Sequence, residues 1–119
     1  MIVLIFASPV WSVQFHPPYE NVIKKLAQWG LKGIELIGWD AAAYRDYYTK
    51  ERILDLKKLI ADLGLQLVNF NYSPGALISE NITLRRADED TYQRAVETAC
   101  ALGSPMLTSV TPYPFSIHK

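Results

Sequence analysis

The chain has 119 residues, about the length of one domain, and half of these residues are hydrophobic. That share of hydrophobic residues favours a packed core over disorder. The formal net charge is zero and the sequence contains no run of Lys or Arg, so we expect no nucleic-acid partner and no membrane partner.

The first predicted element is a strand at residues 2–6, a continuous apolar run of the kind that is buried on both faces. The run lacks a basic leader and is too short for a signal peptide, so we expect a cytoplasmic protein. A long loop, SPVWSVQFHPP, follows and closes at Pro17 and Pro18, which suit the start of a helix. Apolar residues at helical spacing extend this helix to about Trp29, and Gly30 ends it.

A second unit repeats this order of strand, helix and glycine. The strand Gly33–Ile37 leads through a loop rich in Ala and Tyr to Thr49, a good N-cap for the second helix. Gly64 ends that helix, and the third strand is predicted at residues 65–71.

The third unit is predicted to contain a helix that begins near Asp88, a possible cap, and ends before Gly103. A fourth strand follows at residues 106–110. Strands that alternate with amphipathic helices predict a parallel sheet with right-handed crossovers. The glycines that end the three helices are 34 and 39 residues apart. Eight such units would need about 280 residues, near the usual size of a (β/α)₈ barrel.

Two α/β folds fit this order within a single domain over residues 1–119. One is a partial (β/α)₈ TIM barrel that contains the first four strands and three helices. The other is a small doubly wound parallel sheet, which would be complete at this length. The loop after the first strand has no glycine. This counts against a nucleotide or flavin site but leaves the doubly wound topology open.

Three segments carry a resemblance: PPYENVIKKLAQWGLKGIEL, LKKLIADLGLQLVNFN and RAVETACALGSPML. In this order and spacing they resemble the N-terminal half of the xylose isomerase-like TIM barrels, the sugar phosphate isomerases and epimerases. The resemblance implies metal-assisted proton transfer on a ketose through an enediolate. It also implies a divalent ion, Mn²⁺, Mg²⁺ or Co²⁺, in a full-length relative.

The ligands of that ion lie on strands five to eight in the isomerase and epimerase branch, beyond the four strands predicted here. We therefore assign no metal ligand and no catalytic residue to this chain, and we expect no cofactor in it. The single cysteine, Cys100, gives neither an internal disulfide nor a metal cluster. In the endonuclease branch, histidines end strands three and four, whereas residues 69–71 and 108–111 contain none. DNA repair is therefore disfavoured.

Six residues are candidates for contacts with a substrate, because barrel active sites lie at the carboxyl ends of the strands. Side-chain alternation should turn Glu35, Asn69 and Asn71 to the barrel interior as one polar lining, with Leu67 on the same face of its strand. A hydrogen-bond network that only fixes packing is the alternative for Glu35. Trp11 and Trp39 are candidates for aromatic surfaces that contact a sugar. The last candidate is His16, a loop histidine that is either a ligand contact or merely solvated.

These observations predict a fragment or truncated form of a sugar or sugar phosphate isomerase/epimerase, inactive by itself. The alternative is a non-catalytic half-barrel that acts through self-association or through a complementary C-terminal half. Self-association and pairing with a complementary half both follow from the two strands that would be left at the sheet edges, residues 2–6 and 106–110. Neither run contains the Lys, Pro or bulge that usually protects an edge.

Overall fold

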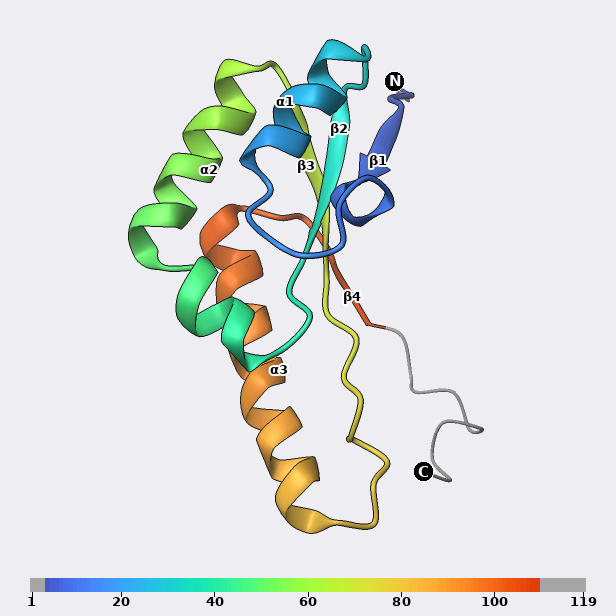
Figure 1. Cartoon of the computed structure of the whole chain (residues 1–119), viewed down its shortest axis with the longest axis vertical. Helices are drawn as coiled ribbons and strands as arrows, with labels where there is room; N and C mark the ends of the chain where they lie inside the picture. Colours follow the sequence, from blue (N-terminus) through green and yellow to red (C-terminus); the bar gives the residue numbers. More distant parts are fainter. Residues whose placement is uncertain (1–3, 110–119) are drawn as a thin grey trace.

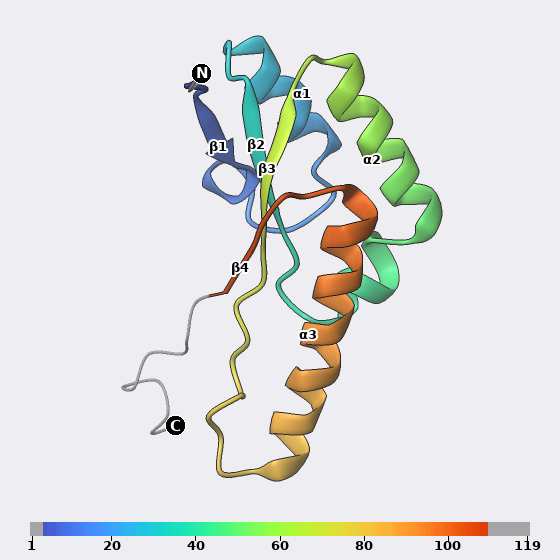
Figure 2. The ribbon, with the colours of Figure 1, turned by 180° about the vertical axis from the view of Figure 1, so that it is seen from behind.

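Four parallel strands form one sheet in the computed structural model, which describes residues 4–109. The strands are β1 (Ala7–Pro9), β2 (Gly33–Ile37), β3 (Gln66–Asn71) and β4 (Leu107–Thr108), and they pair in chain order. The helices α1 (Glu20–Gln28), α2 (Lys50–Asp62) and α3 (Ile82–Leu102) lie along one side of this sheet (Figures 1 and 2). A strand order without reversal is that of a barrel segment, whereas a doubly wound sheet reverses at its switch point. The partial barrel is therefore confirmed.

The first strand lies later in the sequence than predicted. It covers Ala7–Pro9 rather than residues 2–6, and Leu4 and Phe6 before it are 91% and 83% exposed. Residues 2 and 3 lie outside the described part of the chain. The prediction was wrong because it used the apolar run alone, whereas the strand forms where the chain pairs with β2, and the residues opposite Gly33–Glu35 are Ala7–Pro9. The main-chain oxygen of Phe6 still accepts hydrogen bonds from the N–H groups of Lys32 and Gly33.

Side-chain caps mark the starts of α2 and α3, whereas the start of α1 at Tyr19 has no side-chain cap. The Thr49 hydroxyl accepts a hydrogen bond from the N–H of Arg52, as predicted for α2. The third helix begins at Asn81, whose Oδ1 accepts from the N–H groups of Thr83 and Leu84, and not at Asp88. Both residue types cap helices, and local sequence did not decide between them. Asp88 lies inside α3, where its carboxylate accepts from the N–H of Ala76.

The segment between β2 and α2 was predicted as a loop but contains a π-helix, η2 (Ala43–Tyr47). Its tyrosines are buried and bond to neighbouring backbone. The Tyr48 hydroxyl donates to the oxygen of Ile37 at 2.7 Å, and that of Tyr44 donates to the oxygen of Gly38 at 3.2 Å. The Tyr47 hydroxyl accepts from the N–H of Tyr19 at 3.0 Å. These bonds attach the carboxyl end of β2 to the helix layer.

A bulge in β3 changes which residues share a face. Ile34 pairs with Leu67 but Glu35 pairs with Asn69, so Val68 is an extra residue in β3. Leu67 then lies on the helix side, in a hollow that α2 and α3 also line. The prediction that Leu67 shares the face of Asn69 was wrong, because the bulge interrupts the alternation.

The two edge strands are short. The fourth strand is Leu107–Thr108 rather than residues 106–110, of which residue 110 lies outside the described part. The first strand ends at Pro9, so the edge strand as formed contains a proline that the predicted run, residues 2–6, lacks. Short strands and a proline weaken pairing at an edge but do not remove it.

Gly38 offers a test of the packing around η2. A Cβ at this position would lie 2.3 Å from two atoms of the buried Tyr44 ring, whereas a Cβ at Gly75 would meet no atom within 4 Å. We expect Gly38→Ala to lower the free energy of unfolding by about 1–3 kcal/mol, the usual cost of overpacking. Gly75→Ala should change it far less. Urea unfolding of both variants measures the difference, and equal stabilities would contradict the packing.

Candidate functional site

A polar row crosses three neighbouring strands, from the middle of β2 to the carboxyl ends of β3 and β4. Glu35 on β2 pairs with Asn69 on β3, and Asn71 on β3 pairs with Thr108 on β4. The amide of Asn69 lies 3.5 Å from the Glu35 carboxylate and donates to the Thr108 hydroxyl at 2.7 Å. The amide of Asn71 donates to the same hydroxyl at 3.0 Å. The structure thus brings together the three polar candidates on one face.

Thr108 connects the row, and the sequence analysis did not select it. Its oxygen accepts two amide hydrogen bonds, so its own O–H group is left to donate to another acceptor. The register between β3 and β4 was the missing information, because a threonine near a strand end has no distinctive local pattern. Glu35 is half-buried and Thr108 is exposed, so a carboxylate and a hydroxyl are both accessible at this edge.

Asn69 is the most buried member of the row, with 5% of its surface exposed. Its Oδ1 has no hydrogen-bond partner among the described residues. Buried side-chain acceptors are usually satisfied, and those at functional sites are a recurrent exception.

The Asn69 side chain with this unpartnered acceptor lies next to Glu35 and Thr108, because its amide group contacts both. Glu35 and Thr108 therefore flank the one buried side-chain acceptor in residues 4–109 that lacks a partner.

Trp39 lies in an aromatic cluster after β2. Its ring stacks on Phe15 with a centroid distance of 3.9 Å and an interplanar angle of 18°, and Trp11 approaches its edge at 6.4 Å. Its indole N–H donates to the oxygen of Phe15 at 2.5 Å and to the hydroxyl of Tyr19 at 3.2 Å. Phe15, which the sequence analysis did not single out, thus covers one face of the indole. The half-buried Trp39 and Trp11 keep only part of their surface for a ligand.

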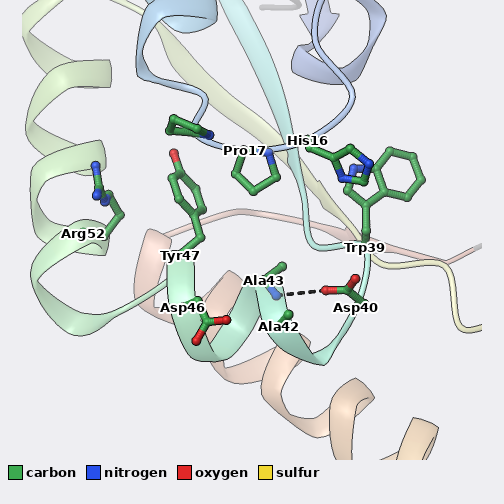
Figure 3. A pocket seen from close by; sticks show the side chains of 10 residues that line it. His16, Pro17, Trp39, Asp40, Ala42, Ala43, Asp46, Tyr47 and Arg52 are labelled. Carbon is green, nitrogen blue, oxygen red and sulfur yellow. Dashed lines mark hydrogen bonds between the residues drawn. The ribbon is translucent and has the colours of Figure 1, made fainter.

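A hollow of about 440 Å³ lies beside this cluster (Figure 3). His16 and Trp39 line it, whereas the polar row does not, so the structure divides the candidates into two groups. His16 is exposed, and its ring meets the edge of Phe15 at 4.9 Å.

The charged groups of the hollow already have partners. Asp40 accepts from the N–H of Ala43 at 3.0 Å, and Arg52 pairs with Glu20 at 2.7 Å. Arg52 is thus paired with an opposite charge, and Asp40 is held by a backbone N–H group.

With the geometry in place, the chain can be compared with known proteins. A family described as "Xylose isomerase-like TIM barrel" matches residues 23–118, which is most of the sequence. The chain belongs to this family. Its resemblance to the N-terminal half of such barrels is thereby confirmed.

A solved relative of this xylose isomerase-like barrel shows the same fold. It is a D-psicose 3-epimerase crystallised in the presence of D-fructose, with a TM-score of 0.71 and 20% sequence identity. The similarity covers 89% of this chain and 37% of the epimerase, so this chain spans well under half of that protein. No curated protein matches the sequence.

The possible metal ligands in the described part of this xylose isomerase-like chain do not form a metal site by themselves. Within residues 4–109, no three side chains of His, Cys, Asp or Glu lie together in a position to hold an ion. The polar row offers one carboxylate, and its other members are two amides and a hydroxyl, so it does not fit a divalent-ion site. None of the described helices is long and apolar enough to cross a membrane.

The polar row predicts a measurable role for Thr108. Thr108→Val keeps the shape of the side chain but removes the acceptor of two amide hydrogen bonds, one of them from the buried Asn69. We expect the free energy of unfolding to fall by about 1 kcal/mol. Ser109→Ala, at the next exposed position, is the matched control. Chemical denaturation measures both variants, and a Thr108→Val protein as stable as the control would show that the row is not formed.

The tyrosine next to Trp39 predicts a loss of stability at high pH. Burial raises the pKa of Tyr19 from its ordinary value of 10.0 to about 12. Because this pKa is raised by folding, the resulting stability is fully present below pH 10.0 and is lost as the pH rises through about 12. Burial also raises the pKa of Tyr47 and Tyr48, which reinforces the effect.

Unfolding experiments across this pH range, with the phenolate absorbance followed in parallel, measure the loss. Tyr19→Phe should show a smaller dependence on pH in the same range. Tyrosines that all ionise near pH 10.0 while the fold persists would contradict this burial.

Proposed function

We propose that this chain forms the N-terminal half of a sugar or sugar phosphate isomerase/epimerase barrel and supplies part of its substrate-binding wall. The observation that carries the proposal is the polar row of Glu35, Asn69, Asn71 and Thr108, which runs from the middle of β2 to the carboxyl ends of β3 and β4. Active sites of (β/α)₈ barrels lie at that end of the strands. The name of the similar epimerase supports a ketose as the class of substrate.

The chemistry of the row suits the hydroxyl groups of a sugar. A carboxylate accepts hydrogen bonds and a threonine hydroxyl donates or accepts them, so the two complement groups that do both. In this proposal Glu35 and Thr108 contact substrate hydroxyls, while Asn69 and Asn71 hold the Thr108 hydroxyl in place. Trp11 and Trp39 supply apolar surface beside the sugar, and His16 contacts it from the loop before α1.

A divalent ion, Mn²⁺, Mg²⁺ or Co²⁺, would supply Lewis-acid chemistry toward a ketose in such a completed barrel. The residues of this chain do not fit that ion, so its ligands would come from strands beyond β4. The contribution of the described residues is to bind and orient the substrate, and a cytoplasmic location and a role in carbohydrate metabolism accompany the proposal.

The test compares the chain with a completed barrel. The 119-residue chain should not turn over ketoses or their phosphates with Mn²⁺, Mg²⁺ or Co²⁺ added. In a barrel completed with strands five to eight, joined to it or supplied as a second chain, turnover should appear. Glu35→Gln keeps the size of the side chain, and in the completed barrel it should lower kcat/KM about tenfold or more, equivalent to roughly 1.4 kcal/mol.

Glu51→Gln, at an exposed position on α2, is the matched control and should leave kcat/KM unchanged. Metal-dependent turnover by the pure 119-residue chain would overturn the proposed division of labour. Unchanged kinetics of Glu35→Gln together with lower stability would instead assign Glu35 to packing.

A further inference from the structure

A second hollow, of about 430 Å³, lies in the helix layer where η2, the first turn of α2 and α3 meet (Figures 1 and 2). Its walls come from residues 44–53 and 94–101, all within the described part of the chain. It shares no lining residue with the polar row or with the hollow beside Trp39. Its volume is in the usual range of small-molecule sites.

The floor of this helix-layer hollow is apolar. Tyr44 and Tyr48 line it and are only 7% and 4% exposed. Their hydroxyls are already used in hydrogen bonds to the backbone oxygens of Gly38 and Ile37, so the rings offer the hollow mainly carbon. Ile53 extends this apolar floor. A floor of this kind suits the carbon skeleton of a ligand rather than an ion alone.

The rim of the hollow has an excess of positive charge. Lys50 and Arg94 line it with one carboxylate, Glu97, which accepts a hydrogen bond from Gln93 at 3.1 Å. Within residues 4–109, none of these three charged groups belongs to an ion pair. Lys50 is also the first residue of α2, where free N–H groups and the helix dipole favour an anion.

Thr98 gives the hollow a hydroxyl group. A threonine inside a helix commonly donates to the carbonyl four residues earlier, as Thr91 does to Ala87 at 2.9 Å. Thr98 is 7% exposed and makes no side-chain hydrogen bond within residues 4–109. Its oxygen is nevertheless not sealed, because Asn69 Oδ1 is the one sealed side-chain atom without a partner in that range. The Thr98 hydroxyl is therefore accessible from the hollow that Thr98 lines.

We infer that the hollow binds a small organic phosphate. The phosphate group lies between Lys50 and Arg94 at the start of α2, and Thr98 donates to one of its oxygens. A phosphate monoester carries close to two negative charges at neutral pH, which match the two cations. Arginine and lysine are the side chains that recognise phosphate, and the carbon skeleton covers the apolar floor. The hollow lies on the helix side of the sheet, so this inference does not depend on the proposed function.

Titration of phenyl phosphate into the ¹⁵N-labelled 119-residue chain tests the site by NMR. Saturable shifts are expected at the backbone amides of residues 50–53 and 94–101, with weaker binding of inorganic phosphate and no binding of phenol. Arg94→Gln should raise the dissociation constant about tenfold or more, because it removes a charged hydrogen-bond donor. Arg86→Gln makes the same change at another exposed position of α3 and should leave it unchanged.

Thr98→Val keeps the shape of the side chain and tests the hydroxyl alone. The dissociation constant of phenyl phosphate should rise about fivefold, while the midpoint of urea unfolding should not fall, because no hydrogen bond within the described residues is lost. A lower midpoint would show that the hydroxyl is bonded within the fold and would overturn the inference. The absence of saturable shifts, shifts confined to the polar row, or equal affinities of Arg94→Gln and Arg86→Gln would overturn it as well. Turnover in a completed barrel tests the proposed function separately.

Discussion

Glu35 and Asn69 lie opposite each other because β3 contains one residue more than β2 in the middle of their parallel pairing. With regular alternation Leu67 and Asn69 would share one face, whereas the extra residue, Val68, lets Leu67 lie on the helix side and Asn69 on the open side. The same register continues to β4, where it places Thr108 within reach of two amide groups. The polar row thus depends on a single irregularity in the sheet.

The helix layer holds this register in place. Ile34, Leu36 and Phe70 are fully buried and face the helices, so sliding β2 against β3 would expose them. Hydrogen bonds also fix how the helix layer lies against β2, since the hydroxyls of Tyr44 in η2 and of Tyr48 just after it bond to the backbone at the end of β2. A carboxyl end that is fixed in this way suits residues that must hold a ligand.

The open side of the sheet is built differently from the helix side. It carries the polar row, the small residues Ala7 and Gly33, and the aromatic cluster around Trp39, rather than a continuous apolar surface. A Cβ at Gly33 would lie 2.9 Å from the Cβ of Ala7 and 3.1 Å from Cγ1 of Val68, so glycine allows these neighbours to approach. Such a face suits the interior of a barrel near its mouth, where polar groups must remain accessible to a substrate.

Local patterns in the sequence were sufficient to predict the helices and the second strand. Helical spacing, the Thr49 cap and three glycines with positive φ located the helices, and the apolar strand Gly33–Ile37 has the predicted bounds. They were also sufficient for the family and for placing Asn69 and Asn71 on the same face of their strand. These features depend on residues close together in the chain, where steric and hydrogen-bonding preferences act directly.

Contacts between distant segments decided the rest. The first strand lies at Ala7–Pro9 because its partner is Gly33–Glu35, and an apolar run without such a partner remains exposed. The π-helix is held by Tyr47, which bonds to the backbone of Tyr19 at the start of α1, and by the adjacent Tyr48, which bonds to β2. Thr108 joins the site because β4 aligns with Asn71. In each case the free energy comes from a pairing across the fold, and no local stretch of sequence specifies its partner.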